Sequence, residues 1–350
     1  MGMDTFEFSY KTTLPKEANA PNVTIKGYSD NEYDILFYVV NQNGLNLTNS
    51  VKGRVNQTVT PNVVQWVVDW YIEVRLNGKL LASDRFNPND KTVFIKMDAH
   101  ALGDNIAWIP YVEEFRKRYN CTVICSTFKN DLFKDIYKDI LFVKPNTIID
   151  NVYAQYYIGA SYDGNIKYSP VSANKVSLQF VATSILNLPP VELRPPLENQ
   201  LKKIKYQKKY VCISEHASDQ KKGWKYKNGW QIIVNYLNYL GYDVVVISKE
   251  KTELKNVIDL TGDHSLLDRA QTLHNAEFFI GLSSGLSWLS WSVNTHVFLI
   301  SDVTQITHEF ITNVTRISAN PDLQEVNYDT INITTPKTVI NKIKDYLNGK

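Results

Sequence analysis

Hydrophobic and polar positions alternate through most of the first ninety residues, in short runs that are separated by turn-forming residues. The alternation is clearest at residues 34–40 and 70–76, and it is typical of strands that bury one face. Asn-Gln-Asn-Gly at 41–44 and Asn-Gly at 77–78 follow these runs and favour hairpin turns. The pattern therefore predicts a small β-rich domain over residues 1–90.

From residue 92 the pattern changes to an apolar strand followed by a helix. The expected elements are strands at 92–97 and 121–126, helices at 106–118 and 130–140, and a tight loop at 101–105. Alternation of strand and helix builds a parallel sheet with crossover helices. We assign residues 91–188 to a first α/β domain.

A dense group of prolines at residues 189–196 is the strongest break in the chain, because proline is excluded from helix interiors and central strands. We interpret residues 189–209 as a stiff linker rich in proline and lysine. The strand and helix alternation then restarts, which predicts a second α/β domain at 210–350. Its expected strands are 210–214, 243–248, 277–281 and 296–300, and its expected helices are 229–240, 265–275, 285–293 and 335–347. Two α/β domains joined by a linker are typical of an enzyme that closes over a cleft.

The composition is that of an ordinary globular protein, with 43% hydrophobic and 21% charged residues among 350. Lys and Arg number 38 against 36 Asp and Glu, so the charge balance indicates neither nucleic acid nor an anionic membrane as a partner. Any anion site must be local. The N-terminus lacks a signal-peptide pattern and no apolar run approaches about 18 residues, so we expect a cytoplasmic protein without a membrane span.

The chain has few residues that could form disulfides or bind metals. Its three cysteines are too few for a disulfide framework, and Cys121 and Cys125 lie on one face of an expected strand, as a core pair would. No zinc motif is present. The motifs of dinucleotide-binding dehydrogenases, P-loop ATPases, zinc proteases and α/β-hydrolases are also absent. The Asn-x-Ser/Thr sequons occur in an Asn-rich chain and read as chance matches.

Two segments have the features of an anion site. Residues 280–289 combine an apolar strand, a turn of Gly and Ser, and an apolar helix, so that free backbone N–H groups and the helix dipole face an anion. A strand-to-helix turn with a purely structural role would look much the same. Residues 218–224 add lysines that could neutralise a pyrophosphate, although Lys221 alone fits a solvated basic loop equally well.

Asp104 follows the strand expected to end near residue 97, at the edge where parallel sheets bind their ligands. It is either the N-cap of a helix that begins at Asn105 or a general base that faces the cleft. Asp98 and His100, on the same loop, are the next candidates for a base.

Several segments together resemble the bacterial autotransporter heptosyltransferases, which are relatives of the lipopolysaccharide heptosyltransferases. The segments that carry the resemblance are residues 70–78, 85–88, 96–115, 257–263 and 279–291. The resemblance implies an α/β protein of GT-B fold, with two facing Rossmann-like domains behind a small N-terminal β domain. It places the acceptor on the 91–188 side and the nucleotide sugar in 210–350.

The resemblance also implies a reaction and its residues. Members transfer heptose from ADP-heptose to Ser or Thr hydroxyls of an autotransporter passenger, with inversion at the sugar carbon. Asp104 matches the catalytic base, and Lys222 matches the lysine that binds the donor diphosphate. The helix N-terminus that binds the same diphosphate matches Ser284, Gly285, Leu286 and Ser287, and the residues near the adenosine match Ser248, Lys249 and Glu250.

The chain departs from the resemblance in one respect. Many members carry a late cysteine finger that binds iron, whereas no cysteine follows Cys212 in this chain. We therefore expect no metal and no cofactor besides the nucleotide sugar. An acceptor protein is the expected partner, and a homo-oligomer is left open.

Two other interpretations stay open. One is a GT-B enzyme with a different nucleotide-sugar donor or a glycan acceptor. The other is a non-catalytic sugar-binding or assembly protein that kept the fold. The joint presence of Asp104, Lys222 and the Ser/Gly turn argues against the second.

Overall fold

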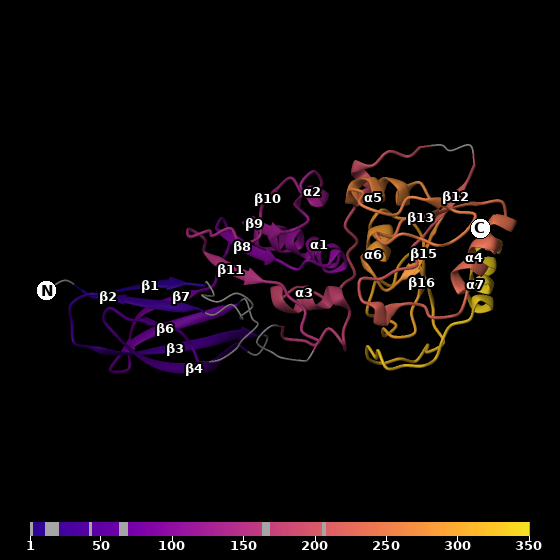
Figure 1. The fold of residues 1–350 in the computed structure, drawn as a ribbon. Helices are drawn as coiled ribbons and strands as arrows, with labels where there is room; N and C mark the ends of the chain where they lie inside the picture. The colour runs from indigo at the N-terminus through magenta and orange to yellow at the C-terminus, as the bar shows by residue number, and fades with distance from the viewer. Residues whose placement is uncertain are drawn as a thin grey trace.

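The computed structural model describes residues 3–10, 21–41, 44–62, 69–162, 169–204 and 208–349. In these ranges the strands form four sheets, two antiparallel sheets near the N-terminus followed by two parallel ones. Figure 1 shows the antiparallel sheets, the first parallel sheet and the second parallel sheet side by side in chain order. Within the described ranges no helix is long and apolar enough to cross a bilayer.

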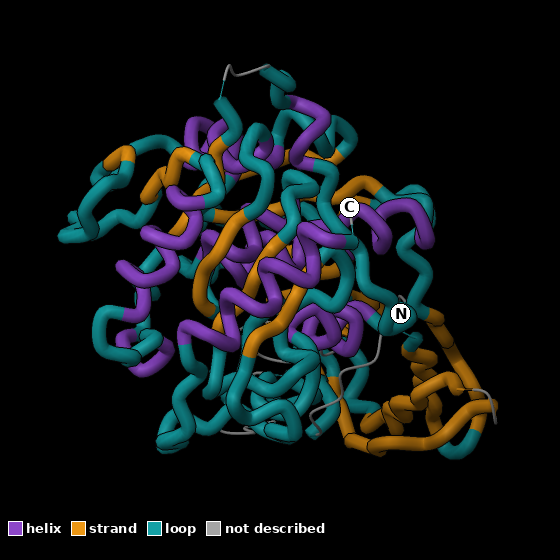
Figure 2. Tube along the Cα trace, turned by 90° about the vertical axis from the view of Figure 1, so that its right-hand side faces the viewer, coloured by secondary structure: helices purple, strands orange, loops and turns teal. Residues whose placement is uncertain are grey.

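The antiparallel part confirms the expected β-rich character of the first ninety residues. One sheet has the order β1 (Thr5–Ser9), β2 (Asn22–Lys26), β5 (Thr58–Val59). The other has the order β4 (Gly44–Arg54), β3 (Glu32–Asn41), β6 (Trp70–Leu76), β7 (Lys79–Arg85). Asn77 and Gly78 form the expected turn between β6 and β7, both with positive φ, while residues 42–43 of the other expected turn lie outside the described residues. Figure 2 shows these strands as a group apart from the helices.

The first parallel sheet has the order β10 (Ile140–Val143), β9 (Thr122–Thr127), β8 (Thr92–Met97), β11 (Ala154–Tyr157). Its helices are α1 (Leu102–Tyr119), α2 (Asn130–Phe133) and α3 (Leu178–Leu186). Cys121 and Cys125 are buried and unbridged at β9, as expected of a core pair.

The expected helix at 130–140 is wrong, because α2 ends at Phe133. The backbone N–H groups of Ile136 and Tyr137 both donate to the Phe133 carbonyl, each at 3.0 Å, and the chain turns there. The turn buries Tyr137 and allows Ile140 to begin an edge strand beside Val123. Tertiary packing thus overrides a local helical pattern.

The second parallel sheet has the order β14 (Ile258–Asp259), β13 (Asp243–Val246), β12 (Tyr210–Ile213), β15 (Phe279–Leu282), β16 (Val297–Ile300), β17 (Val314–Ile317). Its helices are α4 (Gly229–Tyr239), α5 (Leu266–His274), α6 (Gly285–Ser292) and α7 (Pro336–Asn348), and short 3₁₀ turns lie at Leu197–Gln200 and Gln220–Lys222. All four helices expected here are confirmed to within two residues at each end. The strand order reverses between β12 and β15, and ligands of open parallel sheets bind at such a reversal.

The hydrophobic core extends across the molecule. One cluster runs from the antiparallel sheets through α1 and α3 to the α6 face of the second parallel sheet, and a second cluster lies under α4 and α7 on the other face. Residues 188–196 form neither helix nor strand, as the prolines predict. The Glu192 carboxylate in this segment accepts a 3.0 Å hydrogen bond from the Thr312 N–H, so the linker is packed against the second parallel sheet's domain.

Candidate active site

Asp104 lies in the first turn of α1 and is not the helix cap. The helix begins at Leu102 with Ala101 as its N-cap, so the expected loop at 101–105 and the capping interpretation of Asp104 are both wrong. The physical reason lies in the contact between α1 and α6. A side chain at Gly103 would place its Cβ 2.8 Å from Trp288 of α6, so this glycine permits a close helix contact instead of a turn.

The contact between α1 and α6 is reciprocal. A Cβ at Gly285, the first residue of α6, would lie 2.8 Å from the Cβ of Leu102, the first residue of α1. The two glycines therefore bring the N-termini of helices from different sheets together. Both helix N-termini line the same cavity of about 330 Å³.

The carboxyl group of Asp104 has a shifted pKa. Burial raises it to about 6, and the nearby Lys222 ammonium opposes that rise. A carboxylate with this pKa is ionised at neutral pH, yet it is more basic than an exposed aspartate. These are the properties of a general base that works near pH 7.

The other two acidic or basic candidates on this loop have structural partners. Asp98 accepts a 2.7 Å hydrogen bond from the Ser126 hydroxyl, and the His100 ring stacks on Phe128 with 3.9 Å between ring centroids. Neither arrangement applies to Asp104, which is therefore the better candidate for a base.

The turn between β15 and α6 presents unused hydrogen-bond donors to the cavity. Ser284 is the N-cap of α6, its side chain makes no capping bond, and its buried Oγ has no partner in the part of the chain that the structure describes. The first amides of a helix, here those of Gly285 and Leu286, have no intrahelical acceptor. All three residues line the cavity, and together with the helix dipole they favour an anion.

Ser287, which the resemblance groups with these residues, has a different role. Its side chain is fully buried, its hydroxyl donates to the Leu282 carbonyl at 2.5 Å, and its N–H donates to the Ser284 carbonyl at 3.1 Å. Ser287 does not line the cavity. It fixes the turn from behind and has no donor left for a phosphate.

Lys222 brings a positive charge to the cavity from the turn after β12. It lines the cavity, and its charge acts on both Asp104 and Glu309. The neighbouring Lys221 places its ammonium 5.6 Å from the centroid of the Tyr328 ring. Both lysines line another pocket beside Tyr328, but of the two only Lys222 also lines the cavity that contains Asp104.

The expected nucleoside residues Ser248, Lys249 and Glu250 lie after β13 and line the same cavity. The hydroxyls of Ser248 and Ser214 share a 3.1 Å hydrogen bond, which joins the ends of neighbouring strands. All the residues assigned to the site except Ser287 therefore meet in one place.

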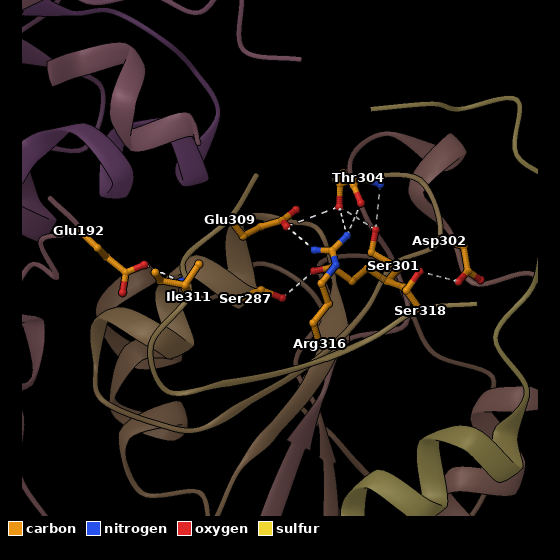
Figure 3. A network of polar contacts seen from close by, with 10 residues as sticks. Glu192, Ser287, Ser301, Asp302, Thr304, Glu309, Ile311, Arg316 and Ser318 are labelled. Carbon is orange, nitrogen blue, oxygen red and sulfur yellow. Dashed lines mark hydrogen bonds and ion pairs between the residues drawn. The ribbon is translucent and has the colours of Figure 1, made fainter. Parts of the chain in front are cut away.

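A buried ion pair lies close to the turn between β15 and α6. Arg316 on β17 donates to Glu309 at 2.7 Å and to the Thr304 hydroxyl at 2.8 Å (Figure 3). Burial alone would raise the pKa of Glu309, but Arg316 above all, together with His308 and Lys222, lowers it to about 2. Glu309 is therefore a buried carboxylate that its ion pair with Arg316 keeps ionised.

A second cavity of about 430 Å³ lies at the carboxyl edge of the first parallel sheet, between the ends of β8 and β11. It shares His100, Asp104 and Tyr162 with the first cavity. The strand order of the first sheet also reverses between β8 and β11. Asp104 thus lies where two cavities meet, one from each parallel sheet.

Among the titratable residues that line the first cavity, sequence reasoning missed Tyr162, His216 and His308. All three lie in segments outside helices and strands, where no periodic pattern indicates a position. One signal was available for His308. It follows a buried strand by eight residues, and loops after the carboxyl ends of parallel strands meet at one edge.

Comparisons with known proteins show which proteins this chain is similar to. Residues 191–305 match the model of glycosyltransferase family 9 (heptosyltransferase). The chain is 36% identical over 235 residues to the autotransporter heptosyltransferase Aah of Escherichia coli, a match that covers 64% of this chain and 60% of Aah. The chain therefore spans about 60% of the length of the curated relatives it matches.

Solved structures show the same fold. The crystal structure of TibC, an iron-containing dodecameric glycosyltransferase from enterotoxigenic E. coli H10407, has a TM-score of 0.80 at 24% identity, covering 96% of this chain and 99% of TibC. The E. coli ADP-heptose lipopolysaccharide heptosyltransferase II has a TM-score of 0.55 at 12% identity, covering 74% and 99%. The expected GT-B architecture and the resemblance to the autotransporter heptosyltransferases are thereby confirmed.

Proposed function

We propose that this chain is an inverting glycosyltransferase that transfers heptose from ADP-heptose to Ser or Thr hydroxyls of an autotransporter-like protein. The observation that carries the proposal is the position of Asp104, where the two cavities meet opposite Lys222. The relatives of this chain are named autotransporter heptosyltransferases, and a TibC structure is described in complex with ADP-D-β-D-heptose. We also propose that the chain has three domains, at residues 1–90, 91–188 and 210–350, with a linker at 189–209. We propose a cytoplasmic location for it.

The donor fits the cavity of the second sheet. Its diphosphate faces the Lys222 ammonium, the Ser284 hydroxyl, and the N–H groups of Gly285 and Leu286. Charge-assisted hydrogen bonds of this kind are among the strongest in proteins. The nucleoside lies toward Ser248, Lys249 and Glu250, at the end of β13.

The acceptor enters through the cavity of the first sheet, so its hydroxyl reaches the Asp104 carboxylate from the side opposite the diphosphate. The hydroxyl oxygen forms a bond to the anomeric carbon while the bond from that carbon to the β-phosphate oxygen breaks. Asp104 takes the hydroxyl proton, and ADP leaves with the electron pair. Attack from the face opposite the leaving group inverts the anomeric carbon.

The leaving group gains negative charge during this step. Lys222 and the first-turn amides of α6 stabilise that charge where it develops, as preorganised donors do in other enzymes. The residues therefore supply both the base and the leaving-group stabilisation without a metal ion.

Iron does not fit the residues present in the way the resemblance describes. The described residues contain no group of three or more His, Cys, Asp or Glu that could hold a metal, and no cysteine follows Cys212. TibC itself is described as iron-containing and dodecameric. We propose a metal-independent reaction for this chain and derive no step through iron.

Intact mass spectrometry of a passenger protein co-expressed with this chain tests the proposal. We expect the acceptor mass to increase by whole heptose residues, and the increase to require a heptose-producing host. A different added mass would indicate another nucleotide-sugar donor. An unchanged mass on every passenger tried, with no binding of ADP or ADP-heptose, would contradict the proposed transferase.

A further inference from the structure

His308 lies in the wall of the donor cavity with one ring nitrogen unused. Its side chain is 3% exposed, it lines the cavity, and its Nδ1 has no hydrogen-bond partner among the residues that the structure describes. Buried polar atoms in native proteins are almost always paired. A buried, unpaired nitrogen in a cavity wall therefore indicates a partner that binds there.

His308 is held beside the first α/β half. The His308 carbonyl accepts a 3.0 Å hydrogen bond from the Leu178 N–H at the start of α3. Its ring lies 6.5 Å from the Tyr162 ring, centroid to centroid. These contacts place the buried ring between the two α/β halves, in the wall of the donor cavity.

The protonation state of His308 decides which partner Nδ1 can take. Burial lowers the pKa of His308, and the positive charges of Lys222 and Arg316 act in the same direction against Glu309. The imidazole is therefore neutral at pH 7. A neutral imidazole carries one ring proton, so Nδ1 either donates or accepts one hydrogen bond.

Phosphate oxygens at neutral pH only accept hydrogen bonds, so they satisfy Nδ1 only in the tautomer that protonates it. A sugar hydroxyl both donates and accepts, so it satisfies Nδ1 in either tautomer. Lys222, which acts electrostatically on His308, is the diphosphate ligand in the proposed function, and the sugar is bonded directly to that diphosphate.

We infer that His308 forms a hydrogen bond with a hydroxyl of the donor sugar and so contributes to recognition of the sugar rather than of ADP. This inference rests on the proposed function. It makes His308 a specificity residue of the donor site, with a role separate from that of Lys222.

The test compares two substitutions at the same position. His308→Leu replaces the ring with an apolar side chain of similar size that forms no hydrogen bond, whereas His308→Asn retains a polar amide close to the place of Nδ1. His296→Leu is the matched control, because His296 is a partly buried histidine at the opposite end of β16, bonded to Asn313 and Thr315 and outside the donor cavity. Calorimetry with ADP and with ADP-heptose gives both affinities for each variant, and a melting curve reports folding.

We expect His308→Leu to weaken ADP-heptose binding about five- to tenfold, the size of one lost hydrogen bond, and ADP binding less than about twofold. His308→Asn should recover most of the difference, and His296→Leu should change neither affinity. Equal weakening of both ligands by His308→Leu, or no weakening, would overturn the inference while leaving the proposed function intact. If the wild-type protein binds neither ligand, the proposed function and this inference both fail.

Discussion

The two parallel sheets both place a cavity where their strand order reverses, but the polar groups at the two edges differ in sign. The first sheet's edge has the carboxylates of Asp98 and Asp104 among aromatic side chains. The second sheet's edge has Lys222, serine hydroxyls and the N-terminus of α6. The same topology thus carries the proposed base on one side and the proposed anion site on the other, and the contact between α1 and α6 joins them. Charge placement, more than topology, therefore distinguishes the proposed acceptor side from the proposed donor side.

The second sheet's edge depends on the buried pair Arg316–Glu309, and removing Arg316 tests that dependence most severely. Arg316→Met leaves the Glu309 carboxylate, which is 1% exposed, without its main cation. We expect the free energy of unfolding to fall by about 3–5 kcal/mol, measured by urea denaturation. The control is Arg54→Met, which breaks an ion pair of exposed side chains to Glu32 and should cost less than about 1 kcal/mol. Equal small losses would show that the network does not support the edge.

The sequence predicted this edge only in part. The regular helices α4 to α7 were predictable because their periodicity is local, and the Ser/Gly turn was visible as a motif. The role of Ser287 was not predictable, since its hydroxyl and the free hydroxyl of Ser284 look alike in a sequence. The difference arises from the Leu282 carbonyl, which only the folded turn brings to Ser287.

The first sheet's edge was harder to predict. Gly103 read as a loop residue, although its function is to let Trp288, far away in sequence, pack against α1. The raised pKa of Asp104 likewise depends on its burial, which only the folded protein shows. The second cavity at the end of β11 had no sequence signal, because β11 itself was not recognised as a strand.

Substitution of each of the two adjacent lysines tests which of them binds the diphosphate of ADP. Lys222→Ala should cost about 1.5–3 kcal/mol of ADP binding free energy, the value of a charged hydrogen bond, because its ammonium faces the cavity. Lys221→Ala should cost less than about 0.5 kcal/mol, since that ammonium lies over Tyr328 instead. Calorimetric titration of ADP into both variants measures the two losses. Similar losses would reduce the site to a diffuse basic patch.

The pH dependence of transfer tests the base side. Because the pKa of Asp104 is about 6 and the carboxylate is the active form, the single-turnover rate should be level above about pH 7 and fall about tenfold per pH unit well below 6. The Lys222 charge lowers this pKa, so Lys222→Ala should move the midpoint to higher pH. A midpoint near the ordinary aspartate value, unmoved in Lys222→Ala, would contradict the coupling between the two edges.

The smallest effect is expected from removing metal ions. Elemental analysis should find no stoichiometric iron or zinc in the purified protein, and a chelator should leave the transfer rate unchanged, because Lys222 and the α6 amides stabilise the leaving group. One equivalent of a transition metal per chain, lost together with activity in chelator, would contradict a metal-independent donor side.

We propose that one edge supplies the base and the other binds the diphosphate. The most direct test is Asp104→Asn, with ADP affinity and sugar transfer both measured on the same protein. Asparagine keeps the size of the side chain, and Asp104 is not the cap of α1, so folding should be unchanged. ADP affinity should also stay within about twofold, because the diphosphate ligands come from the other sheet. We expect single-turnover transfer to fall by about 10²–10⁴, the usual loss for a missing general base. A variant that still transfers sugar within about threefold of wild type, at unchanged ADP affinity, would show that Asp104 is not the base.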